Sequence, residues 1–266
     1  MPAFRFKGLR TVVAAGLLTL AGAAPAFAAG AEVTPPEQEW AHGGVYRPFA
    51  GIFSTYDPAA LQRGFQVYKE VCAACHSMDL LAYRNLQELG FSEAEVKAIA
   101  AEYEVQDGPN DEGEMFTRPA LPSDRFKSPF PNEKAAAAAN NGKAPPDLSL
   151  MVKARAHAED YVYGVLTGYE EAPVGTAVPE GAYYNKYFPG HLIAMAPPLT
   201  EGAVTYADGT EATVAQMAHD VTSFLAWAAE PNLNTRKQMG VMVLMFLIVF
   251  AGIMYAAKRR LWADVH

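Results

Sequence analysis

Two cysteines and a histidine, in the sequence CAACH at residues 72–76, constrain this chain more than any other feature. In an exported protein, C-x-x-C-H is typical of covalent haem c attachment, in which two thiols form thioethers with the porphyrin and the histidine ligates the iron. The alternatives are a thioredoxin-like dithiol and part of a zinc site. Cys72 and Cys75 are the only cysteines of the chain, which excludes a four-thiolate zinc site. The motif therefore predicts one haem c, with His76 as an iron ligand.

The N-terminal residues have the pattern of an export signal. Arg5, Lys7 and Arg10 precede an apolar run over residues 11–20 and an A-x-A sequence at residues 26–28. We expect cleavage after residue 28 and a mature chain that begins near Ala29. An uncleaved anchor is the alternative, but the run is short for a membrane span. Export to a bacterial periplasm also suits covalent haem attachment.

A second apolar stretch covers residues 239–257. At about 1.5 Å per residue it can cross a hydrocarbon core of about 30 Å, and its lack of a polar stripe disfavours a buried core helix. Lys258, Arg259 and Arg260 follow, and the positive-inside rule predicts a cytoplasmic location for them. The predicted organisation is a signal peptide (1–28), a periplasmic haem domain (29–235), a single anchor helix in the bacterial inner membrane (236–258) and a basic cytoplasmic tail (259–266).

The predicted haem domain is strongly acidic. The chain has 21 Lys and Arg against 29 Asp and Glu. Leaving out three basic residues in the signal and five that flank the anchor reduces the basic count to about 13, and leaving out Asp264 reduces the acidic count to about 28, a net charge of about −15. This excess disfavours nucleic acid and anionic lipid, and favours electrostatic steering of a basic protein partner. Ordinary solubility explains it equally well.

Helical periodicity predicts two helices that cross near the haem motif. Asp57 and Pro58 form a helix start, and an apolar face then recurs at Leu61, Phe65, Tyr68 and Cys72. Gly64 leaves room for another helix to approach closely. That helix starts at the capping sequence of residues 213–216, carries an apolar stripe to residue 228 and ends before Pro231. This arrangement indicates a mainly α domain of the class I cytochrome c type with long insertions.

Two more helices are expected in the insertions. Ser92 and Glu95 form a capping box for a short helix that reaches residue 103, and residues 150–166 have an amphipathic pattern. Residues 29–55 are rich in Gly, Pro and aromatic residues without a clear period, so we expect an extended segment there.

Met195 is the candidate for the second axial ligand of the iron. It lies in an apolar segment, residues 190–199, that ends in a proline pair and precedes the last helix of the domain. Prolines fix the backbone there, and His/Met ligation suits a high-potential electron carrier. Methionine more often fills a core, and His191 is a competing ligand. The other candidates considered, Met78, Met115 and Met151, are less suitably placed.

Longer motifs extend well beyond the haem signature. They include HSMD at residues 76–79, VQDGPN at 105–110, ANNG at 139–142, PPDLS at 145–149, MAPP at 195–198 and WAAEP at 227–231. Through these motifs the chain resembles the cytochrome c1 family, the haem subunits of the quinol-oxidising cytochrome bc1 complex, from about residue 40 to the basic tail. Unlike some bacterial members of that family, the chain has no second cysteine pair.

The resemblance implies a site and a set of partners. It implies thioethers at Cys72 and Cys75 and axial ligation by His76 and Met195. It also implies a haem pocket lined by Asn140, Pro145, Pro146, Arg155 and Tyr161. Arg155 would lie near a propionate. From the residues alone, Arg155 would be a solvated helix residue. A proline carbonyl can accept from the His76 ring and fix its tautomer. The implied partners are cytochrome b, the Rieske iron–sulfur protein as donor and a soluble basic cytochrome c as acceptor, in a dimeric complex.

The predicted function is electron transfer in a respiratory or photosynthetic chain, by a subunit that is not catalytic alone. An anchored haem sensor or ligand-binding module is the first alternative, in which Met195 would be displaced by a gas. A haem-free disulfide oxidoreductase is the second alternative.

Overall fold

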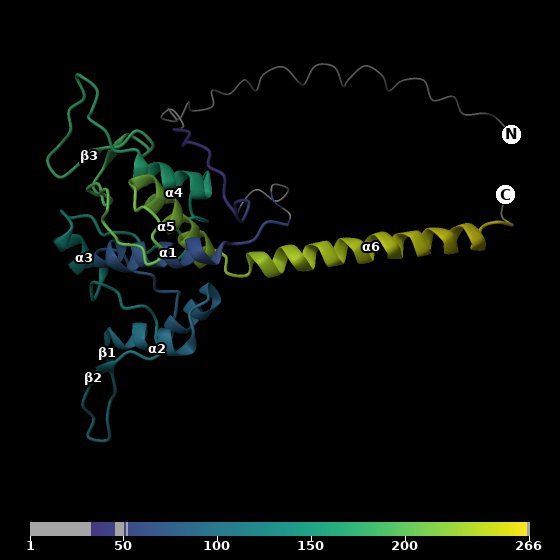
Figure 1. Cartoon of the computed structure of the whole chain (residues 1–266), viewed down its shortest axis with the longest axis horizontal. Helices are drawn as coiled ribbons and strands as arrows, with labels where there is room; N and C mark the ends of the chain where they lie inside the picture. Colours follow the sequence, from purple (N-terminus) through teal and green to yellow (C-terminus); the bar gives the residue numbers. More distant parts are fainter. Residues whose placement is uncertain (1–32, 46–50, 52, 265–266) are drawn as a thin grey trace, which may run out of the picture. The chain divides into compact units, whose positions relative to one another are not determined.

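The protein is described by a computed structural model for residues 33–45, 51 and 53–264. The predicted signal peptide lies outside these residues. The described chain is mainly helical, with two short antiparallel hairpins (Figure 1). The helices are α1 (Pro58–Glu70), α2 (Glu93–Ala101), α3 (Glu133–Ala139), α4 (Ala158–Thr167), α5 (Val214–Ala229) and α6 (Leu233–Leu261), with 3-10 turns η1 (Cys72–Ala74) and η2 (Tyr83–Leu89). The strands are β1 (Glu104–Asp107), β2 (Phe116–Pro119), β3 (Tyr183–Tyr184) and β4 (Leu192–Ile193).

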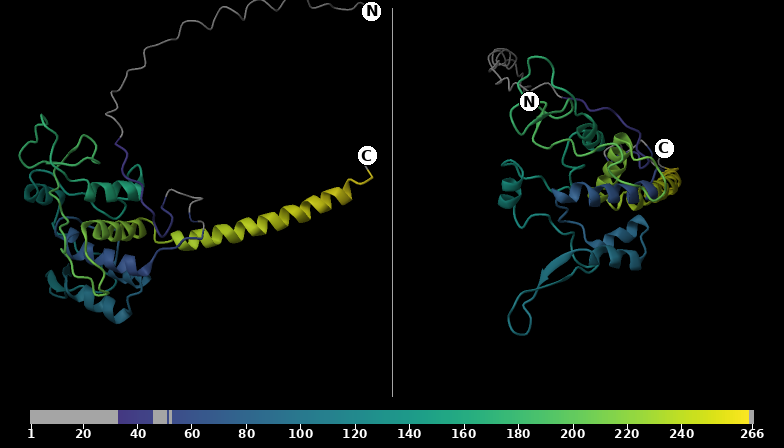
Figure 2. Two further views of the ribbon diagram at one scale, coloured as in Figure 1. Left: turned by 45° about the horizontal axis from the view of Figure 1, so that its top comes forward. Right: turned by 60° about the vertical axis from the view of Figure 1, so that its left-hand side comes forward.

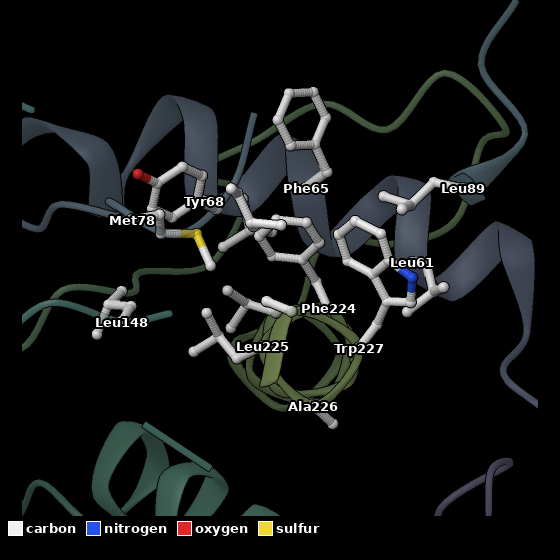
Figure 3. Packing of buried hydrophobic residues seen from close by; sticks show 14 of the residues in the cluster. Leu61, Phe65, Tyr68, Met78, Leu89, Leu148, Phe224, Leu225, Ala226 and Trp227 are labelled. Carbon is white, nitrogen blue, oxygen red and sulfur yellow. The ribbon is translucent and has the colours of Figure 1, made fainter. Parts of the chain in front are cut away.

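The crossing of α1 and α5 forms the centre of the domain, as predicted. Helix α5 packs against α1 on one side and α4 on the other (Figures 1 and 2). A side chain at Gly64 would collide with the backbone of Asp220 and lie 2.7 Å from Phe224 Cβ, so glycine permits this close approach. Phe224 of α5 points toward Phe65 and Tyr68 of α1, with ring centroids 5.7 Å apart in both pairs (Figure 3).

The helix ends follow most of the predicted capping signals. Asp57 accepts from Ala59 N at the start of α1, and Ser92 and Glu95 form the full capping box of α2. At α5 only half of the predicted box is present. Thr213 accepts from Gln216 N, but the Gln216 side chain donates to Asp220 instead.

The predicted helix at residues 150–166 is wrong in its first half. Helix α4 begins only at Ala158, and the preceding eight residues form turns. His157 and Ala158 have φ values of 61° and 47°, a left-handed conformation that interrupts an α-helix. The apolar residues of this stretch are partly buried although the chain forms turns there. Sequence periodicity cannot distinguish such turns from an amphipathic helix.

Two consecutive buried acids at the start of α4 hold the N-terminal segment on the domain. Glu159 accepts from Val45 N and pairs with His42 Nε2 at 2.9 Å, and Asp160 accepts from Trp40 Nε1 at 2.9 Å. Residues 33–40 contain neither helix nor strand, as expected. The segment therefore depends on side-chain hydrogen bonds rather than on a regular backbone ladder.

Helix α6 carries the predicted anchor sequence. It begins three residues before the predicted anchor, has a mean hydropathy of 2.4 in its most apolar window, and within the described residues is the one helix long and apolar enough to cross a membrane. Lys237 in its second turn donates to the carbonyls of His42, Gly51 and Ser54. The exact domain boundaries remain predictions.

Candidate haem site

The haem motif forms a tight turn directly after α1. In the 3-10 turn η1, Cys75 N and His76 N both donate to Cys72 O, at 3.1 and 2.9 Å. Both thiols are free, with Cys75 exposed and Cys72 half-buried. Burial, with a smaller contribution from Cys75, raises the pKa of Cys72 to about 12.

The His76 ring is oriented by a backbone carbonyl. Its Nδ1 lies 2.7 Å from Pro146 O, and because a carbonyl oxygen only accepts, Nδ1 carries the proton. Burial lowers the pKa of His76 below its usual range, although Pro146 and Asp147 oppose this shift. The ring is thus held neutral with its Nε2 lone pair available, which is the form in which histidine binds a metal. The predicted hydrogen bond from His76 to a proline carbonyl is confirmed, with Pro146 as the acceptor.

Asp147 links the Pro146 segment to the residues that follow His76. Its Oδ2 accepts from Ser77 Oγ at 2.9 Å and from Asp79 N at 2.8 Å, and its Oδ1 accepts from Ser149 N. Burial raises the pKa of Asp147, but hydrogen bonds from Ser149, Asp79 and Ser77 outweigh it and leave the pKa below the ordinary value. Asp147 carries no sequence signal for this role, because Ser77 and Asp79 lie about 70 residues away in the chain.

Met195 follows the β3–β4 hairpin and is half-buried. Its carbonyl accepts from Tyr169 Oη at 3.0 Å, which ties the segment to the end of α4. Burial raises the pKa of Tyr169, so its hydroxyl remains a donor. The rival methionines are placed differently: Met78 is fully buried in the core, Met115 is exposed and Met151 packs against the core. Tyr169 was missed because an isolated tyrosine carries no sequence signal.

The other predicted pocket residues lie on separate elements. Asn140 ends α3 and donates to Ala136 O at 2.8 Å, Pro145 is half-buried, and Tyr161 on α4 packs against the core. Arg155 is exposed on the turns before α4 and donates to Ala154 O, so it is solvated as its sequence suggested but is not helical. Within the described part of the chain, Pro146 alone of these residues hydrogen-bonds His76.

The donor set fits a covalently attached haem better than a protein-only metal site. Among the described residues, no three His, Cys, Asp or Glu side chains converge to hold a metal ion. Two thiols one turn apart, one exposed and one half-buried, and a neutral imidazole are the groups that haem c attachment requires. In addition, the His191 ring has a buried nitrogen without a hydrogen-bond partner in the described chain.

Comparison with known proteins decides the family. The sequence profile of the Cytochrome C1 family matches residues 47–265, which is most of the chain. The chain belongs to the cytochrome c1 family. It is 48% identical to cytochrome c1 of Rhodospirillum rubrum over 96% of this chain and 97% of that protein. It is 52% identical to the mitochondrial heme protein cytochrome c1-2 of Solanum tuberosum over 92% of each chain. It is also 50% identical to cytochrome b/c1 of Bradyrhizobium diazoefficiens over 96% of this chain, but spans only 39% of that protein.

Family membership confirms the main sequence predictions. Cytochrome c1 is the haem subunit of the cytochrome bc1 complex, in which it functions with cytochrome b and the Rieske protein in electron transfer. Proteins of this family carry one covalently bound c-type haem, for which Cys72 and Cys75 supply both thiols. The mainly helical fold and the membrane-anchored character of the subunit are also as predicted.

Proposed function

We propose that this cytochrome c1 carries electrons from the Rieske protein to a soluble, basic cytochrome c-type acceptor, with His76 and Met195 as axial ligands. The 2.7 Å contact between His76 Nδ1 and Pro146 O carries this proposal, because it presents a neutral imidazole with a free Nε2. Asn140, Pro145, Pro146, Arg155 and Tyr161 line the pocket in this proposal, and Arg155 pairs a propionate. The bound haem supplies a one-electron iron couple, and a thioether ligand favours the reduced state.

The protein residues around this site have no acid–base task in the proposed function. Pro146 fixes the tautomer and direction of His76, and Asp147 holds the Pro146 segment against residues 77–79. Tyr169 fixes the main chain at Met195. These contacts would keep the coordinating atoms in place when the iron changes charge, which favours fast electron transfer.

The proposed topology places the haem domain in the periplasm and residues 259–266 in the cytoplasm. The apolar surface of α6 and the basic residues Lys258, Arg259 and Arg260 in its last turn support this orientation. Residues 1–28 act as a cleaved signal in this scheme. The name of the Bradyrhizobium relative, which joins cytochrome b and c1, supports the association with cytochrome b. We further propose that the complex is a dimer.

Substitution of Met195 tests the ligand assignment. With Met195→His, a nitrogen ligand replaces the thioether, and the midpoint potential should fall by on the order of 0.1 V, within the roughly 0.8 V range that axial ligands cover. Met217→Leu is the matched control, because Met217 is fully buried in α5 and this swap conserves volume. Redox titration and visible spectra of the purified complex provide the measurement. An unchanged spectrum and potential in Met195→His would contradict ligation by Met195. Carbon monoxide binding by the reduced wild type would favour the sensor alternative.

A further inference from the structure

A tight turn shortly before α1 exposes an aromatic ring. Ser54 N donates to Gly51 O at 2.8 Å, and Gly51 has a φ of 68°; we call the turn that these residues close the Phe53 turn. Phe53 lies within it and is 82% exposed, the largest exposed fraction of any aromatic side chain in the described residues. Isolated apolar residues are common on protein surfaces, so the location of this turn decides what the exposure means.

The Phe53 turn lies beside the first two turns of α6. Tyr56 N donates to Asn234 Oδ1 at 3.2 Å, in the first turn of this helix. One helical turn further along α6, Lys237 Nζ donates to Gly51 O at 2.9 Å and to Ser54 O at 3.3 Å. From Tyr56 back to Gly51, the contacts therefore move along α6 toward its apolar stretch. These hydrogen bonds fix the turn at the base of the membrane anchor.

The turn is also level with the point at which the surface of α6 becomes apolar. Met239 is 56% exposed and begins the exposed apolar side chains of this helix. Lys237 precedes Met239 by two residues, which is about 3 Å along the helix axis. In a membrane-anchored protein this level is the boundary between lipid headgroups and acyl chains. Aromatic side chains are enriched at that boundary.

The charge of Lys237 is satisfied by the protein itself. Its ammonium group has three N–H donors, and three main-chain carbonyls accept from it, those of His42 at 2.6 Å, Gly51 at 2.9 Å and Ser54 at 3.3 Å. A lysine near the end of a membrane helix usually extends its charge toward the water at the interface. Here the side chain bonds to the loop instead, so its charge does not keep the Phe53 turn away from lipid.

We infer that the Phe53 turn is a second membrane contact of the haem domain, in which the Phe53 ring inserts into the phospholipid bilayer between headgroups and acyl chains. Lys237 holds the turn at that depth. A single helix lets the domain tilt toward or away from the membrane, and a second contact beside the helix restricts this tilt. The inference rests on α6 as the membrane anchor and does not depend on the axial ligands of the haem.

A spin label at residue 53 tests the depth of the turn. Cys72 and Cys75 are the only cysteines and are both bound to haem in this family, so Phe53→Cys provides a single free thiol for a nitroxide. The full-length, haem-loaded protein is placed in phosphatidylcholine nanodiscs. Electron paramagnetic resonance then compares the accessibility of the label to oxygen, which concentrates in lipid, and to a water-soluble nickel chelate. Val243→Cys in α6 is the lipid control, and Val174→Cys in a fully exposed loop is the water control.

We expect the oxygen-to-nickel accessibility ratio at residue 53 to be several-fold above that at residue 174 and below that at residue 243. A ratio equal to that at residue 174 would overturn the inference, because the ring would then be in water. Low accessibility to both reagents would also overturn it, because the ring would then pack against protein. If the label at residue 243 is accessible to nickel, the anchor assignment itself fails, and the inference fails with it.

A second substitution tests the hold of Lys237 on the turn. In the labelled Phe53→Cys background, Lys237→Met removes the donor to all three carbonyls, and the label should become more mobile and more accessible to nickel. Ser54→Ala is the matched control, because Ser54 contributes only its main-chain groups to these contacts. An unchanged label in Lys237→Met would overturn the role given to Lys237.

Discussion

Replacing Gly64 with alanine should destabilise the domain at the point where its two central helices cross. A Cβ at this position would lie 2.7 Å from Phe224 Cβ and closer still to the Asp220 carbonyl. Ordinary contact begins at 3.4 Å, so α5 would have to move by at least 0.7 Å, the difference between these distances. Most of the obstruction is backbone, which no side-chain rotation can relieve.

The net effect is the difference between two opposing terms. Alanine in place of glycine within a helix contributes about 0.5–1 kcal/mol of stability. Overpacking of a dense core costs about 1–3 kcal/mol or more, and a collision with backbone belongs at the upper end of that range. We therefore expect Gly64→Ala to lower the free energy of unfolding by about 2 kcal/mol. For a domain of roughly 200 residues this corresponds to a decrease in Tm of about 4–8 °C.

The assay is thermal unfolding of the full-length haem-loaded protein in detergent, followed by circular dichroism. Gly240→Ala in α6 is the matched control, because a Cβ there would meet no atom within 4 Å. The control should melt like the wild type. Because α1 leads directly into the haem turn, Gly64→Ala should also alter the haem spectrum, whereas Gly240→Ala should not. A Gly64→Ala protein that melts at or above the wild-type temperature would refute the argument.

Two further predictions concern Asp147 and the acidic surface. Asp147→Ala removes the acceptor for Ser77, Asp79 and Ser149. It should reduce the free energy of unfolding, measured in urea, by about 2–3 kcal/mol. The control Asp111→Ala, in an exposed loop, should have little effect. Folding lowers the pKa of Asp147. Its contribution to the free energy of unfolding is therefore present above the unfolded-state pKa and is lost as the pH falls through the folded-state pKa. The variant and the wild type should thus have similar stabilities in acid. Electron transfer to a basic cytochrome c should slow by at least several-fold as ionic strength rises and the Debye length falls from about 30 to 8 Å. A rate independent of salt would contradict acidic docking.

Local signals predicted the helices that carry the motif. Asp57, Pro58 and the apolar face of α1 are adjacent in sequence, so capping and periodicity determine them without knowledge of the rest of the fold. Gly64 was also interpretable, because a glycine on the buried face of a helix indicates close approach. Residues 150–157 failed the same reasoning, since the left-handed His157 and Ala158 break a pattern that looks helical.

Contacts between distant segments were beyond these signals. The Asp147 hydrogen bonds join residues about 70 positions apart, and Tyr169 reaches the main chain of Met195 across 26 positions. Neither contact leaves a signal in the composition or the periodicity of the sequence. His191 was noticed only as a competing ligand, because sequence alone does not show which ring nitrogen is buried.

The architecture couples the haem turn to the stability of the domain. Helix α1 supplies both the face that packs on α5 and the residues that lead into Cys72, so the depth of the crossing at Gly64 affects where the thiols and His76 lie. His76 in turn is fixed by Pro146, whose segment is held by Asp147 to the residues just beyond the motif. The helix crossing, the haem turn and the Pro146 segment are therefore joined by chain continuity and by direct hydrogen bonds. The haem motif itself is five residues long, but its geometry depends on α1, α5 and the segment around Pro146 together.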